Sequence, residues 1–104
     1  MEEDNPFKDT LNTDEALHAP ARIALLLFLL PRTKVTFSVA QKALNITAGN
    51  LSSHLKKLEK SEFIYIEKAF IKSKPTTTIS ITSKGHSSIM NYVQTLNKAL
   101  EDKP

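Results

Sequence analysis

The 104-residue chain has no cysteine and no tryptophan, two glycines, and no long hydrophobic run. The lack of cysteine excludes disulfides, thiolate metal sites and thiol catalysis, and it fits a reducing cytoplasm, where we expect the protein to reside. The longest apolar stretch, Ile23 to Leu30, lies between Pro20 and Pro31 and falls far short of the roughly 20 residues needed to cross a bilayer. We therefore expect a buried core helix there and no membrane partner.

Signatures of catalysis and of cofactor binding are also missing. The sequence contains no glycine-rich phosphate loop and no pairing of a nucleophile with a base. No two of the three histidines, His18, His54 and His86, stand at the spacing of metal ligands. We expect no enzymatic activity, no metal and no cofactor.

What the chain does have is an uneven distribution of charge beneath a modest net charge of +3. Residues 1–15 sum to −5, residues 16–100 to +9 and the last four residues to −1. The acidic start is the opposite of the basic start of a secretory signal. The length suits one domain, and a basic body of this size is a reason to consider a polyanion as partner.

Turn and capping residues divide the chain into short elements. Residues 1–10 lack periodicity and predict a disordered acidic arm, which leaves a single domain over residues 11–104. Ser38 with Gln41 three residues later forms a capping-box pair, and Asn45 suits a sharp left-handed turn. The predicted elements are a helical entry over 14–18, a helix from 20 to 30, an extended piece over 34–37, helices over 39–44 and 47–60, strands over 63–70 and 76–82, and a last helix capped by Thr82.

The helix over 47–60, capped by Thr47, has two different faces. Leu51, Leu55 and Leu58 form one apolar stripe. The opposite face begins small and polar and ends cationic, with Gly49, Asn50, Ser53, Lys56, Lys57 and Lys60. A helix that enters the DNA major groove needs this pattern, because small side chains permit close approach, short polar ones meet base edges, and lysines reach phosphates.

The order of elements predicts a winged helix-turn-helix, mainly α with a small β-hairpin wing. The wing tip over 71–76 carries Lys72 and Lys74. The residues that we expect at double-stranded DNA are Ser38, Thr47, Gly49, Asn50, Ser53, His54, Lys56, Lys57, Lys60, Lys72 and Lys74. An apolar repeat in the last helix and the apolar helix after Pro20 favour a homodimer, with an interface that includes Leu11, Leu17, Ile89, Val93, Leu96 and Leu100.

Over residues 14–100 the chain resembles the small winged-helix transcription regulators related to the MarR and ArsR families, in particular compact archaeal members. The similar segments are "HAPARIALLLFLL", "FSVAQKALNITAGNLSSHLKKLEKSEFIYIEK" and "TTTISITSKG". The resemblance implies a cytoplasmic homodimer on double-stranded DNA, with the helix of residues 47–60 in the major groove, the wing along the backbone or minor groove, and the terminal helices as dimer interface.

Some features depart from these families. ArsR proteins that sense metals use cysteines, MarR wings carry Asp and Arg where this chain has Lys72 and Lys74, and no sensor domain is added. The operator and any small-molecule effector are unknown.

Several alternatives are open at this stage. The lysine clusters are either solvated surface or phosphate contacts, and His54 either touches DNA or packs beside the core. The apolar stripe of the last helix serves a dimer or the core of one subunit. In function, the alternative to a sequence-specific transcription regulator is a winged-helix module for protein–protein interaction.

Overall fold

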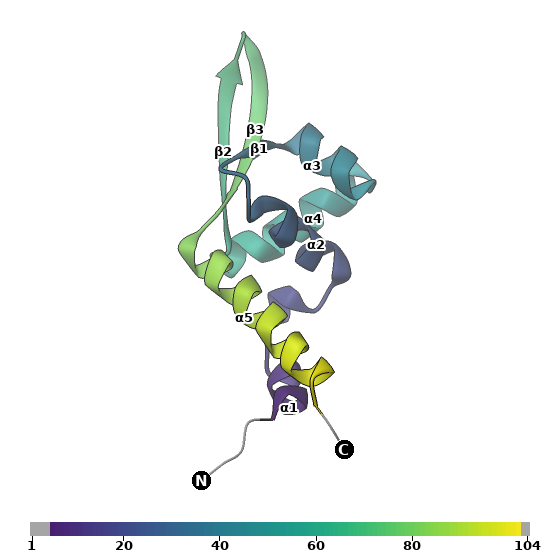
Figure 1. Ribbon diagram of the computed structural model, residues 1–104. Coiled ribbons are helices and arrows are strands. Elements are labelled where there is room, and N and C mark those ends of the chain that lie inside the picture. Colours follow the sequence, from purple (N-terminus) through teal and green to yellow (C-terminus); the bar gives the residue numbers. More distant parts are fainter. Residues whose placement is uncertain (1–4, 103–104) are drawn as a thin grey trace.

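The computed structural model describes residues 5–102, and within them it shows a mainly helical winged-helix fold (Figure 1). The elements are α1 (Pro6–Leu11), the 3-10 helix η1 (Glu15–Leu17), α2 (Pro20–Leu29), β1 (Val35–Thr36), α3 (Phe37–Leu44), α4 (Ala48–Lys60), β2 (Ile64–Ile71), β3 (Lys74–Ile81) and α5 (Ser83–Leu100). The predicted fold class is confirmed. Among the described residues, no helix combines the length and the apolarity that a membrane span requires.

The core lies where α2, α4 and α5 meet the root of the sheet. Leu25, Leu26 and Leu29 of α2 are fully buried, as is Ile89 of α5. The predicted stripe of α4 is confirmed, because Leu51, Leu55 and Leu58 are all buried. Burial of this stripe directs the opposite face of α4 to solvent.

Helix α1 corrects the expectation of a disordered arm over residues 1–10. Residues 1–4 lie outside the described part, but from Pro6 the chain is helical. The Asn5 side chain caps the helix by accepting a hydrogen bond from the Lys8 N–H (3.1 Å), and proline suits the first helical position. The helix packs against α5. Six residues are too few to show periodicity, so this long-range packing left no trace in the sequence.

The helix-turn-helix formed by α3 and α4 differs from the prediction at one cap. Thr36, and not Ser38, caps α3, because its Oγ1 accepts a hydrogen bond from the Val39 N–H (3.2 Å). The left-handed turn at Asn45 is confirmed, with φ 51° and ψ 50°. Thr47 caps α4 as predicted, accepting from the Asn50 N–H (3.1 Å).

The sheet is antiparallel in the order β1-β3-β2, and β2 and β3 pair from Ile64 with Ile81 to Ile71 with Lys74. The connecting turn contains Lys72 and Ser73 alone and is thus shorter than the loop predicted over 71–76. Both residues have positive φ, 52° and 64°, which matches the right-handed twist of a hairpin. The wing projects as a long ribbon, and α1 lies at the opposite end of the molecule (Figure 1).

Candidate nucleic-acid interface

The face of α4 that points away from the core carries every residue the sequence pattern assigned to it. Thr47 is exposed, and so are the six residues predicted for this face, which are Gly49, Asn50, Ser53, Lys56, Lys57 and Lys60. Within residues 5–102, no carboxylate forms an ion pair with Lys56, Lys57 or Lys60. The second half of the helix therefore presents lysines without an ion-pair partner in the described chain, and Asp14 and Glu15 line the same hollow as Lys57 and Lys60.

The two glycines of the chain differ in whether packing within the protein requires them. At Gly85 in α5, an added Cβ would collide with the backbone carbonyl of Phe63, so the protein's own packing requires glycine there. At Gly49 in α4, a Cβ would meet no atom within 4 Å. The fold thus gives no internal reason for a helix-weakening residue at Gly49, at the exposed start of α4.

Behind this face, His54 and Arg22 support α4. Arg22 is 6% exposed, and its Nε donates to the carbonyl of Ala16 (2.7 Å). Its NH1 donates to Nδ1 of His54 (3.2 Å), and its NH2 donates to the carbonyl of Glu15 (3.4 Å). The half-buried His54 ring is thus a hydrogen-bond acceptor in a polar cluster that joins α2, η1 and α4. A DNA contact by His54 stays a prediction.

Burial lowers the pKa of His54, and the positive charges of Arg22 and then Lys57 add to the effect. All three causes favour the neutral ring, which is the form that accepts a hydrogen bond from a guanidinium. The electrostatics and the geometry of the cluster therefore agree.

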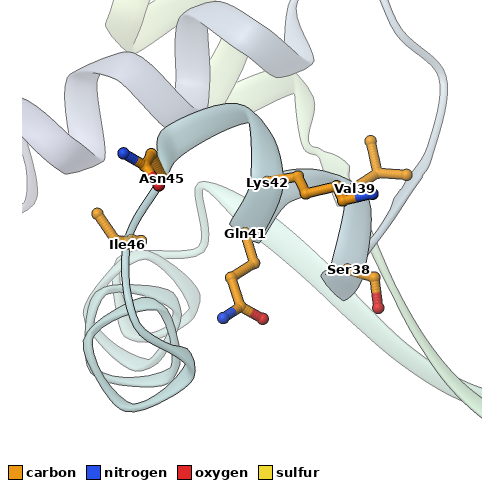
Figure 2. A pocket seen from close by; sticks show the side chains of 6 residues that line it. All are labelled: Ser38, Val39, Gln41, Lys42, Asn45 and Ile46. Carbon is orange, nitrogen blue, oxygen red and sulfur yellow. The ribbon is translucent and has the colours of Figure 1, made fainter.

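A hollow of about 460 Å³ lies beside α3 and the turn that leads into α4 (Figure 2). It is lined by Ser38, Val39, Gln41, Lys42, Asn45 and Ile46. Ser38, which was predicted to contact DNA, is exposed here, whereas Gln41 and Lys42 were not among the predicted residues. A signal was present, because residues 38, 41 and 42 share one face of a helix. Polar groups of α3 thus extend the exposed polar surface of α4.

The wing carries the two lysines predicted at its tip and one that was missed. Lys72 and Lys74 are exposed, and so is Lys68 in β2. Glu67, the neighbouring acid, is paired with Lys34 across the sheet (3.2 Å). Positive charge therefore follows both α4 and the wing.

The residues predicted for a dimer interface divide into two groups. Leu17 (3% exposed) and Ile89 (0%) belong to the chain's own core, which corrects their assignment to an interface. Leu11 (79%), Leu96 (37%) and Leu100 (83%) are exposed, whereas Val93 is half-buried. Phe7 of α1, which was not predicted from the sequence, is also exposed. These exposed side chains belong to α1 and the second half of α5, which lie side by side (Figure 1).

Comparison with known proteins gives consistent matches. Residues 21–100 match the family model described as winged helix DNA-binding domain. An uncharacterised protein of Methanocaldococcus jannaschii is 39% identical over 72 residues, which cover 69% of this chain and 78% of that protein.

Solved structures show the same fold. The transcriptional regulator homologue protein from Pyrococcus horikoshii is 32% identical with a TM-score of 0.85, over 92% of this chain and 94% of that one. MepR of Staphylococcus aureus, solved as a complex with DNA, is 19% identical with a TM-score of 0.71, over 90% of this chain and 78% of MepR. At that level of identity, the MepR match establishes the fold alone.

Proposed function

The chain belongs to the winged helix DNA-binding domain family, and on this premise we propose that it is a sequence-specific transcription regulator that binds double-stranded DNA as a homodimer. It shares its fold with MarR and with an ArsR-family regulator. These regulators are not enzymes. We place the protein in the cytoplasm, where its DNA target would be accessible.

The observation that carries the proposal is the combination of an unexplained glycine and unpaired lysines on one face of α4. Packing within the protein does not require glycine at position 49. The lack of a side chain there would let the DNA backbone or bases approach α4 closely. Asn50 and Ser53 offer short hydrogen-bonding side chains to base edges, in the region where a recognition helix meets the major groove. The lysines one and two turns later then reach phosphates, which set the register.

Further groups extend this interface in two directions. Ser38 and Gln41 of α3 line the hollow beside α3 and the turn into α4 (Figure 2), and a DNA strand that follows α4 would pass on this side. Lys72 and Lys74 at the wing tip add charge at a distance from α4. A protein that contacts DNA through both elements spreads its phosphate contacts along the duplex, and its affinity then depends steeply on salt.

The homodimer is supported by the apolar end of the molecule. Leu11 and Leu100 are each about four-fifths exposed, and Phe7 is more than half exposed. Exposed apolar side chains on adjacent helices favour burial against a second copy. A twofold dimer would also present two α4 helices to two half-sites about 34 Å apart, one turn of B-DNA.

Selection of bound fragments from random duplex DNA, at a stated salt concentration, tests the proposal. We expect a palindromic consensus with half-sites repeating at about 10 base pairs. If the protein binds all duplexes equally, it is not sequence-specific. If it binds none, the winged helix serves contacts with proteins instead.

A further inference from the structure

Arg22 fixes the protonation state of His54 in the free protein. A guanidinium does not lose its proton in proteins, so the arginine is the donor in the contact of 3.2 Å between Arg22 NH1 and His54 Nδ1. Nδ1 must then hold a lone pair, and the single N–H group of the ring is at Nε2. Protonation of His54 would place a second N–H group at Nδ1, directly opposite the guanidinium, and the contact would break.

The histidine, and not the arginine, is the partner that is free to move. Arg22 is 6% exposed and is held by the carbonyls of Ala16 (2.7 Å) and Glu15 (3.4 Å). His54 is half-buried, and within residues 5–102 its ring makes no hydrogen bond besides the one to Arg22. A protonated ring can therefore turn toward solvent while Arg22 keeps its other two acceptors.

The charges around His54 offer a protonated ring no anion within the described part of the chain. Arg22 on α2 and Lys57 on α4 are both cations, and after burial they lower the pKa of His54. On η1, the carboxylates of Asp14 and Glu15 share a hollow with two lysines of α4, and no carboxylate among the described residues forms an ion pair with His54. An imidazolium at this position therefore needs an anion from outside the chain.

We propose that His54 is a proton-linked switch in DNA binding: its neutral ring is held by Arg22 in the free protein, and its protonated ring turns onto a DNA phosphate. The proposal rests on the DNA binding of α4 proposed above and adds its regulation by pH. At about 100° per residue, His54 lies within about 60° of Asn50 and Lys57 around α4, so a side-chain rotation brings the ring to the exposed face. A phosphate there raises the pKa of the ring, and DNA binding then takes up a proton.

The affinity of the full-length protein for one duplex of mixed sequence, measured from about pH 8 to about pH 5.5 at one salt concentration, tests the switch. As the pH falls through about 6.5, the usual pKa of histidine, affinity should rise by up to about tenfold per pH unit for each bound subunit. The rise should level off below the lowered pKa of His54 in the free protein. In parallel, the ring proton signals of His54 in NMR spectra should titrate at higher pH with DNA than without it.

His54→Gln keeps a hydrogen-bond acceptor for Arg22 and cannot be protonated, so it should bind as wild type at the alkaline end and show no gain in acid. His86→Gln is the matched control, because His86 is an exposed histidine of α5, and it should keep the gain. A wild type whose affinity does not change with pH, an equal gain in His54→Gln, or a ring that titrates at the same pH with and without DNA overturns the switch and leaves DNA binding intact. A protein that binds no duplex at any pH overturns both the switch and the proposed function.

Discussion

The guanidinium of Arg22 lies 3.2 Å from Nδ1 of His54 and thereby connects the buried side of α2 with α4. The same side chain donates to the carbonyls of Ala16 and Glu15 in η1. A buried arginine is costly unless its donors are paired, and here two other elements, η1 and α4, supply the acceptors. The position of α4, the helix that we propose to face DNA, is thus fixed in part by a polar cluster inside the protein.

Replacing Arg22 with alanine should lower the free energy of unfolding by about 2 to 4 kcal/mol, since the change removes three hydrogen bonds and leaves buried acceptors unpaired. Denaturant titration measures the loss. Arg32→Ala is the control, because Arg32 is exposed and lies over the Phe28 ring, 3.8 Å from its centroid. Equal losses in both variants would contradict a special role for the Arg22 cluster.

Stability should fall in acid because of His54. Its pKa is lowered in the folded protein by burial, then by Arg22 and Lys57, so the unfolded chain takes up a proton at higher pH than the folded one. The folded state therefore loses stability as the pH falls through about 6.5, the usual pKa of histidine.

The free energy of unfolding, measured from pH 8 to pH 5 for wild type and His54→Gln, tests this. The glutamine variant keeps a hydrogen-bond acceptor and should lack this component of the pH dependence. Parallel profiles would show that His54 does not cause it.

Gly49→Ala should stabilise the protein by up to about 1 kcal/mol while weakening DNA binding, because alanine is the better helix former and the Cβ site is empty in the free protein. Gly85→Ala should destabilise the protein, because the added Cβ would collide with the Phe63 carbonyl. Thermal unfolding and DNA affinity are measured together. A Gly49→Ala protein that is more stable and binds DNA normally would show that no close approach occurs at this position.

Asn50→Ala should cost about 1 to 3 kcal/mol on the best DNA site and almost nothing on random DNA, because a base contact carries sequence information and a phosphate contact does not. Binding to both kinds of duplex at one salt concentration gives the comparison. Lys57→Ala is the contrasting variant and should weaken binding to both. A uniform loss in Asn50→Ala would assign its side chain to the backbone.

Leu100→Glu should convert the proposed dimer to monomers and weaken binding to a palindromic site, because the change places a carboxylate in an apolar interface. Sedimentation at micromolar concentration follows the assembly. Leu27→Glu on α2 is the control, as Leu27 is also exposed (42%) and lies outside the proposed interface. A wild type that sediments as a monomer would refute the dimer.

Local signals in the sequence predicted much of the helix-turn-helix. The leucine stripe of α4, the left-handed turn at Asn45 and the cap at Thr47 all act over a few residues, and all three are confirmed. The predicted cap of α3 was wrong because Thr36 and Ser38 are both good capping residues and lie two residues apart. Pairing of Val35 with β3 favours Thr36, the earlier of the two.

The remaining features depend on contacts between distant segments, which periodicity does not report. Helix α1 is held by α5, and the burial of Leu17 follows from packing in the core. Arg22 is a charged residue within the apolar helix α2, and this anomaly is visible in the sequence. Its acceptor on α4, however, lies 32 residues farther along the chain.

The turn at the end of the wing has one more consequence. Lys72 and Ser73 both adopt left-handed backbone angles, which Asn and Gly accept far more readily than lysine does. An Asn-Gly turn would therefore hold the two strands more firmly and would carry one positive charge fewer. The hairpin thus has a cation at its tip and a less rigid turn. Two substitutions, Lys72→Asn and Ser73→Gly, would make the turn stiffer and would remove the electrostatic attraction of Lys72.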